Sequence, residues 1–179
     1  MSNLTYQAIK KRPLNDKVVV ITGASSGVGR AAALEFAASK TNLVLAARRI
    51  QTLNELVQEC EALGARAIAV PTDITDPEAV KNLAQSAIKF GGKIDVWINN
   101  AGVLAAGSLT GTPIEIHDRV IDTNLKGYIH GAFNVLPYFK EQKYGILINN
   151  ISVGGWIPTP YAVGYTASKF GLCGFSEAL

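Results

Sequence analysis

Short apolar runs recur along this sequence, and longer segments with helical periodicity separate them. The runs are Val18–Ile21, Leu43–Ala46, Ala67–Val70, Val96–Ile98 and Ile146–Ile148. Apolarity within each run is continuous rather than alternating, which is typical of strands covered on both faces, as in a parallel sheet. Alternation of such strands with helices indicates βαβ units, so the pattern predicts an α/β fold with a parallel sheet.

The segments between the runs carry apolar residues at helical spacing, which indicates helices with one buried face. The two clearest faces comprise Leu53, Leu56, Val57, Cys60 and Leu63, and Val80, Leu83, Ala84, Ala87 and Ile88. Asp76 followed by Pro77 is typical of an N-cap and a first-turn proline, and Thr112 with Glu115 forms a capping-box signature. With 179 residues, 48% of them hydrophobic and 17% charged, the chain is long enough to form one packed domain.

Composition excludes several classes of function. The net charge of +3 comes from scattered or terminal basic residues, so nucleic-acid binding is not expected. Cys60 and Cys173 belong to no CxxC pair, which predicts no metal site and suits a reducing cytoplasm. The uncharged stretches 96–114 and 146–168 are interrupted by asparagine, glycine and proline, so we expect no membrane span. Residues 1–16 lack an apolar core and are predicted to be a flexible arm rather than a signal peptide.

A glycine-rich segment directly follows the first apolar run and contains the predicted start of a helix. From Thr22 to Arg30 it reads TGASSGVGR. Glycines here permit a tight turn and let the backbone approach a pyrophosphate, while the helix N-terminus offers N–H groups to the anion. The spacing GxxxGxG differs from GxGxxG, and no lysine follows to make a GxxxxGK[ST] phosphate loop. A simple turn is the alternative, but the location favours a dinucleotide site on a Rossmann-like sheet.

The second apolar run ends in two arginines, Arg48 and Arg49. In a Rossmann-like fold this strand ends near the adenosine ribose, where a carboxylate would bind the free 2′-hydroxyl of NAD. No acidic residue stands here, and the planar donors of a guanidinium suit the oxygens of a 2′-phosphate. The sequence therefore favours NADP over NAD. The alternative is that one of the arginines is a solvated residue opening the next helix.

Tyr165 and Lys169 are four residues apart in the segment GYTASKFG. In a helix this spacing puts both on one face, about 6 Å apart along the axis. A free phenol has a pKa of about 10 and is a poor base at neutral pH. An ammonium about 4.5 Å away, at an effective dielectric constant of about 20, favours phenolate by roughly 3 to 4 kcal/mol. The pair is therefore a candidate general acid and base.

Further motifs occur in register with these and extend over nearly the whole chain. Residues 99–102 read NNAG and follow the fourth run. Asp73 follows the third run, and Ser152 lies thirteen residues before Tyr165. Together with the TGxxxGxG turn, these motifs resemble those of the short-chain dehydrogenase/reductase family.

The resemblance implies a Rossmann-like doubly wound sheet with strand order 3-2-1-4-5 and a site for NADP(H). The implied cofactor contacts are Gly23, Ser25, Ser26, Gly27, Val28, Gly29, Arg48, Arg49, Asp73, Ile74, Asn100, Ala101, Gly102, Tyr165 and Lys169. The implied catalytic residues are Asn124, Ser152, Tyr165 and Lys169.

By the same resemblance, Tyr165 exchanges a proton with a substrate oxygen while hydride moves between the substrate carbon and the nicotinamide. Ser152 would hydrogen-bond that oxygen, Lys169 would bind the nicotinamide ribose and favour phenolate, and Asn124 would hold a water that links the lysine to solvent. The implied protein is an NADP-dependent oxidoreductase acting on a small-molecule carbonyl or secondary alcohol. Homodimers or homotetramers built on the helices around Asn124 and after Tyr165 are the implied assembly.

The same residues bear on other possible functions. A serine hydrolase is not expected, because Ser152 lacks the first glycine of GxSxG and neither histidine is close in sequence. A dinucleotide-binding scaffold or sensor without turnover stays open, as does a family member that epimerises or dehydrates its substrate. Taken singly, each proposed catalytic residue could have an ordinary structural role, and only their joint occurrence favours chemistry.

The sequence departs from the family at its C-terminal end. It stops at Leu179, inside the helix expected near Tyr165, whereas family members continue with a sixth strand, a substrate-covering loop and usually a seventh strand. We therefore expect residues 17–179 to be a truncated dinucleotide-binding catalytic domain that lacks strands 6 and 7 and leaves strand 5 as a bare edge. Apolar residues in 103–109 and 153–163 favour hydrophobic substrates, or else they cover the cofactor or the missing loop.

Overall fold

The computed structural model describes residues 14–179, so most of the predicted arm (1–16) lies outside the described residues. Within that range the chain forms a five-stranded parallel sheet with the order β3-β2-β1-β4-β5, which confirms the predicted topology. The strands are β1 (Val18–Thr22), β2 (Asn42–Ala47), β3 (Arg66–Pro71), β4 (Val96–Asn99) and β5 (Ile146–Asn149). The helices are α1 (Gly27–Ala38), α2 (Ile50–Ala62), α3 (Pro77–Gly91), α4 (Ile114–Ile121), α5 (Gly127–Gln142) and α6 (Val163–Ala178). A π-helical turn, η1 (Asp122–Lys126), joins α4 to α5, and a 3-10 turn, η2 (Val153–Gly155), follows β5.

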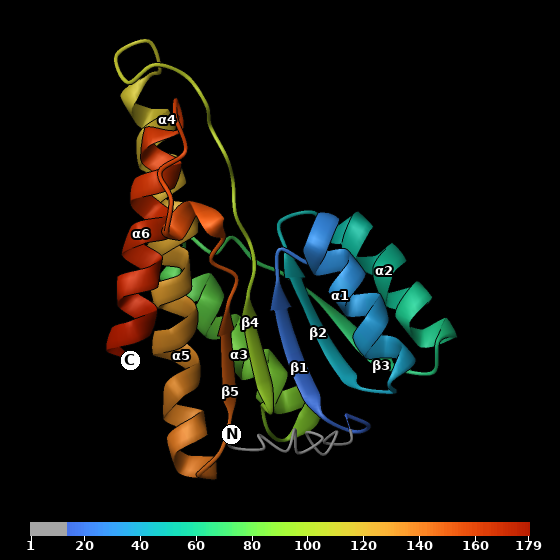
Figure 1. The fold of residues 1–179 in the computed structure, drawn as a ribbon. Coiled ribbons are helices and arrows are strands. Elements are labelled where there is room, and N and C mark those ends of the chain that lie inside the picture. The colour runs from blue at the N-terminus through green and yellow to red at the C-terminus, as the bar shows by residue number, and fades with distance from the viewer. Residues whose placement is uncertain (1–13) are drawn as a thin grey trace, which may run out of the picture.

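Helices cover both faces of the sheet, with α1 and α2 on one side and α3 and α5 on the other (Figure 1). Alternate residues of β1 point to opposite sides: Val19 and Ile21 pack against α1 and α2, whereas Val18 and Val20 pack against α3 and α5. All four are essentially fully buried. Burial on both sides explains why the sequence of β1 is continuously apolar. Strand β5 is equally apolar, but Ile146 and Ile148 are exposed at the edge of the sheet.

Most of the predicted helix boundaries agree with the structure. Asp76 accepts a hydrogen bond from the Glu78 N–H at 2.9 Å and caps α3, with Pro77 in the first turn. The capping box predicted from Thr112 to Glu115 is wrong, because α4 begins after Pro113 and has no side-chain cap; the Thr112 N–H instead donates to the Ser108 carbonyl. Leu63 was also wrongly assigned to the buried face. Since α2 ends at Ala62, Leu63 is left 46% exposed.

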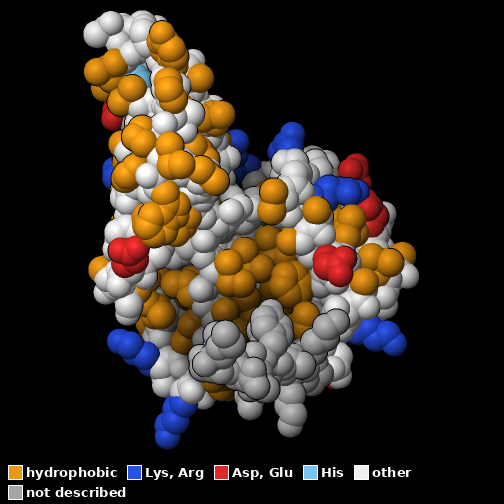
Figure 2. Space-filling model, viewed as in Figure 1, with side chains coloured by type: hydrophobic (Ala, Val, Ile, Leu, Met, Phe, Trp, Pro, Cys, Tyr) orange, Lys and Arg blue, Asp and Glu red, His pale blue; other side chains and the backbone are white. Residues whose placement is uncertain are grey.

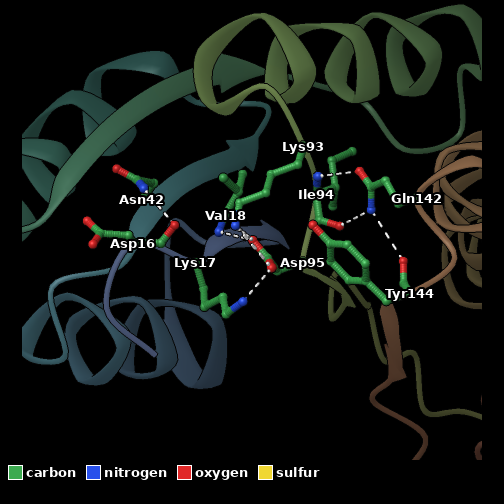
Figure 3. Close-up of polar contacts among 9 residues, drawn as sticks. All are labelled: Asp16, Lys17, Val18, Asn42, Lys93, Ile94, Asp95, Gln142 and Tyr144. Atoms are coloured by element: carbon green, nitrogen blue, oxygen red, sulfur yellow. Dashed lines mark hydrogen bonds and ion pairs between the residues drawn. The ribbon is translucent and has the colours of Figure 1, made fainter. Parts of the chain in front are cut away.

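A polar cluster fixes the N-terminal ends of β1 and β4 (Figure 3). The buried carboxylate of Asp95 accepts hydrogen bonds from the Val18 N–H (2.9 Å) and from Lys17 Nζ (3.0 Å), and Lys93 Nζ lies 3.2 Å away. Burial raises the pKa of Asp95, but these hydrogen bonds and charges outweigh burial and hold it below its usual value. The side chain of Gln142 pairs with both backbone groups of Ile94. These contacts set the alignment of β1 with β4, and so where their C-terminal ends meet.

Beyond the C-terminal ends of the strands, α4, the start of α6 and their connecting loops project from the body of the molecule (Figures 1 and 2). Large apolar side chains are exposed in these segments, including Leu104, Leu109, Trp156, Ile157 and Tyr161. Strand β5 forms one edge of the sheet, as predicted. Among residues 14–179, every helix is too short or too polar to cross a bilayer.

Candidate active site

A cavity of about 1270 Å³ lies at the C-terminal ends of the strands, where ligands bind in open α/β sheets. It joins parts of the chain that are far apart in sequence: the glycine-rich turn, the ends of β2 and β3, the turn after β4, residues 150–152 after β5 and the start of α6. All but two of the predicted site residues line it. The two exceptions are Gly29 and Asn124.

The three glycines of this segment, Gly23 after β1 and Gly27 and Gly29 in the first turn of α1, have different structural roles. Gly23 has φ +67°, and a Cβ there would lie 2.6 Å from Ala101 Cα. A Cβ on Gly29 would collide with the Gly23 carbonyl and the Asn100 side chain, so Gly29 serves close packing behind the cavity. Gly27 has φ +54° and would meet nothing within 4 Å. It faces open space, so the backbone at this position is accessible to a ligand.

The turn after β4 braces the glycine-rich turn. Thr22 Oγ1 accepts hydrogen bonds from the backbone N–H groups of Asn100 (3.0 Å) and Ala101 (3.2 Å). In return, Asn100 Nδ2 donates to the Thr22 carbonyl at 3.0 Å. The two turns therefore form one rigid wall of the cavity.

The residues at this wall fit a dinucleotide phosphate. Ser26 occupies the N-cap of α1 with an extended backbone, and its side chain makes no capping hydrogen bond. The first N–H groups of α1 are thus left for an anion at the positive end of the helix dipole. Because Gly27 adds no side chain, the cavity stays open at this point.

At the adenosine end, charged groups surround the end of β3. Asp73 Oδ1 accepts from the Thr75 N–H (3.0 Å) and the Thr75 hydroxyl (2.8 Å). Burial raises the pKa of Asp73, but these two hydrogen bonds and the charges of Arg48 and Arg119 lower it below its usual value. Arg48 and Arg49 are exposed at the end of β2 and line the same cavity. A carboxylate acceptor and guanidinium donors therefore lie together where a nucleoside would bind.

At the other end, Tyr165 and Lys169 from the first half of α6 meet Ser152 from the turn after β5. Lys169 is 4% exposed; its Nζ lies 5.8 Å from the centre of the Tyr165 ring and donates to the Asn150 carbonyl at 2.9 Å. Burial lowers the pKa of Lys169 to about 8. Both side chains therefore line one cavity, as the four-residue spacing in a helix allows.

Ser152 has φ 137° and ψ 159°, a combination rarely adopted by residues other than glycine. Its Oγ accepts a hydrogen bond from the Gly154 N–H at 3.1 Å, which helps to hold this conformation. A Cβ on Gly154 would lie 2.9 Å from the Tyr165 ring, so the turn and the ring are in close contact. Backbone strain at this position is typical of functional sites.

Asn124 lies within η1, behind the cavity wall, and is fully buried. Its side chain accepts from the Val103 N–H and donates to the Val103 carbonyl, both at 2.8 Å, and donates to Ser168 Oγ at 3.3 Å. These contacts tie the loop after β4 to α6, next to Lys169. The water-binding role predicted for Asn124 stays a prediction, and its side chain already has these partners.

Several cavity residues were missed by sequence reasoning. Thr72, Asn150 and Ile151 directly follow or precede predicted site residues at strand ends, which is the signal that would have found them. A second group comes from α4 and η1: Glu115, Asp118, Arg119, Asp122 and Thr123. Their three- and four-residue spacing marks one helix face, but the sequence does not say which way that face points.

Comparisons with known proteins agree with this arrangement. The family profile described as short chain dehydrogenase matches residues 17–179. An uncharacterized oxidoreductase of Listeria monocytogenes is 39% identical over 166 residues, which cover 93% of this chain and 67% of the relative.

Two solved structures are similar over 93% of this chain. A short chain dehydrogenase/reductase from Burkholderia phymatum in complex with NAD has 34% identity and a TM-score of 0.89, with 60% of that chain covered. NAD⁺-bound xylitol dehydrogenase has 29% identity and a TM-score of 0.89, with 65% covered. This chain therefore spans 60 to 67% of the length of these three relatives. From the profile match and these likenesses, the chain belongs to the short-chain dehydrogenase/reductase family.

Proposed function

We propose that this chain carries the cofactor-binding and catalytic residues of an NADP(H)-dependent oxidoreductase that interconverts a carbonyl and a secondary alcohol. The observation that carries the proposal is the single cavity with the glycine-rich turn at one end and Ser152, Tyr165 and Lys169 at the other. Family membership supports the reaction class. In this proposal residues 17–179 belong to the dinucleotide-binding catalytic domain.

The residues that would hold the cofactor are those of the two cavity ends. The N-terminus of α1 would hold the pyrophosphate, Asp73 would face the adenine, and Lys169 would hold the nicotinamide ribose. When bound, the cofactor supplies or accepts the hydride, and the chain contributes geometry and charge.

Ser152 and Tyr165 would act on the substrate oxygen. The Ser152 oxygen already accepts from the Gly154 N–H, so its own hydroxyl proton is free to be donated to that oxygen. Tyr165 would give a proton to the oxygen in reduction and take one in oxidation. The Lys169 ammonium, held near the phenol ring, would stabilise the phenolate left by proton donation.

The preference for NADP rests on the end of β2. Arg48 and Arg49 line the cavity there, and a 2′-phosphate would gain charge-assisted hydrogen bonds from a guanidinium. NAD is the less favoured alternative, and it is kept because two similar structures hold NAD.

The remaining parts of the proposal concern the setting of the protein. Exposed Ile129 and Phe133 on α5 support assembly as a homodimer or homotetramer, which light scattering on purified protein tests. Cys60 and Cys173 are free thiols, which suits the cytoplasm. Apolar side chains near the cavity favour a hydrophobic carbonyl or alcohol substrate.

The test is a fluorescence titration of the chain with NADPH and NADH, followed by turnover with a panel of hydrophobic ketones. We expect saturable binding, tighter for NADPH, and oxidation of NADPH that depends on the ketone. Binding without turnover across the panel would favour a cofactor-binding scaffold or sensor. Failure to bind either dinucleotide would overturn the proposal.

A further inference from the structure

The ammonium of Lys169 is buried with little obvious compensation for its charge. Lys169 is only 4% exposed, and burial lowers the pKa of its ammonium to about 8. Among the described residues, no carboxylate lies within ion-pair distance of it. Buried charges normally have a partner, because desolvation otherwise favours the neutral form.

Tyr128 of α5 supplies such a partner. Its ring centre lies 5.1 Å from Lys169 Nζ, closer than the Tyr165 ring at 5.8 Å. The Tyr128 hydroxyl donates to the Asn150 carbonyl at 3.3 Å, and Lys169 Nζ donates to the same carbonyl at 2.9 Å. Tyr128 itself is 1% exposed, so its ring cannot turn away to solvent.

The chemistry of the two groups makes this contact favourable. A cation within about 6 Å of an aromatic ring face is attracted by the ring quadrupole, and more strongly when both are desolvated. Burial, and then the proximity of Tyr165, raise the pKa of Tyr128, so it stays a neutral phenol. The groups that face Lys169 are then the Tyr165 phenol on its own helix, the Tyr128 phenol on α5 and the Asn150 carbonyl after β5.

We propose that Tyr128 is a positioning residue whose ring face keeps the Lys169 ammonium charged and oriented toward the catalytic cavity. Its importance for turnover rests on the function proposed above. The contact itself exists without cofactor or substrate, so it is testable in the free protein. Tyr128 would act through Lys169 and touch neither substrate nor cofactor.

The experiment is a pH titration of the Lys169 ε-methylene signal by ¹H–¹³C NMR in the cofactor-free chain. Loss of the signal in Lys169→Arg assigns it. Tyr128→Phe keeps the ring face, and Tyr128→Leu removes it while filling much of the space. Phe139→Leu is the matched control, since Phe139 is a buried aromatic residue on the same helix that packs against the sheet.

We expect Tyr128→Phe and Phe139→Leu to leave the midpoint of Lys169 within about 0.3 pH units of the wild type. Tyr128→Leu should lower it by about half to one pH unit, a three- to tenfold change in the acid dissociation constant. An unchanged or higher midpoint in Tyr128→Leu would overturn the proposal, and so would an equal fall in Tyr128→Phe. If Tyr128→Leu does not fold, Tyr128→Met carries the same expectation. Absence of turnover in the wild type would refute the proposed function but leave this titration intact.

Discussion

Gly155 controls how closely the turn that carries Ser152 approaches helix α6. A Cβ on Gly155 would lie 2.9 Å from the Lys169 carbonyl oxygen and 2.6 Å from Ile151 Cγ2. Ordinary contacts need at least 3.4 Å, so in Gly155→Ala the backbone of α6 must move away by about half an ångström. This motion separates Ser152 from Tyr165 and Lys169, which travel together on α6.

We expect this displacement in Gly155→Ala to have two effects, one on stability and one on turnover. Overpacking should destabilise the fold by about 1 to 3 kcal/mol, which thermal unfolding measures. Misplacing the reacting groups by about half an ångström should lower kcat on the order of tenfold. Gly174→Ala is the matched control: Gly174 lies on the same helix, a Cβ there meets nothing within 4 Å, and the change should be neutral or stabilising.

A double-mutant cycle separates positioning from simple loss of stability. If Gly155 acts by setting the distance between Ser152 and Tyr165, Gly155→Ala should cost little further kcat in a Ser152→Ala background. Additive losses in kcat would refute this reasoning, as would wild-type turnover in the single variant.

Further predictions concern the cofactor site and the sheet. Arg48→Ala should weaken NADPH about tenfold and NADH little; equal losses in the two titrations would contradict the 2′-phosphate assignment. Gly23→Ala should abolish tight NADPH binding and lower the unfolding temperature, because its φ of +67° and the nearby Ala101 backbone leave no room for a methyl group. Asp95→Asn should cost about 1 to 3 kcal/mol at pH 7 in urea unfolding. Since the pKa of Asp95 is lowered on folding, its contribution is complete above the unfolded value of about 4 and is lost as pH falls through the folded value. The variant should therefore lose less stability than the wild type between pH 5 and about 2, and parallel pH curves would rule out this role.

Much of the fold was predictable because the central strands β1, β2 and β4 are buried on both faces. Continuous apolar runs identified all five strands. Gly23 and Gly29 carried information because neighbouring backbone approaches them too closely for a side chain. Failures occurred where local signals competed with tertiary contacts. At Thr112 the sequence predicts a capping box, but the structure has a turn in which the Thr112 N–H donates to the Ser108 carbonyl.

The less predictable part of the site comes from the helices that follow β4. The π-helical turn around Asn124 has no distinct signature in residue propensities, yet such turns are frequent at functional sites. Whether the acidic face of α4 or the ring of Tyr128 points into the site depends on how α4 and α5 pack against α6 and the sheet. Helical periodicity identifies a face, but long-range packing decides its orientation.

We propose that one cavity joins a dinucleotide site to a tyrosine that exchanges a proton with substrate. The most direct measurement compares wild-type protein with Tyr165→Phe for NADPH affinity and for single-turnover hydride transfer to a ketone. We expect equal NADPH affinity and a loss of hydride transfer of at least about a hundredfold, because only the proton donor is removed. Unchanged transfer in Tyr165→Phe would contradict it.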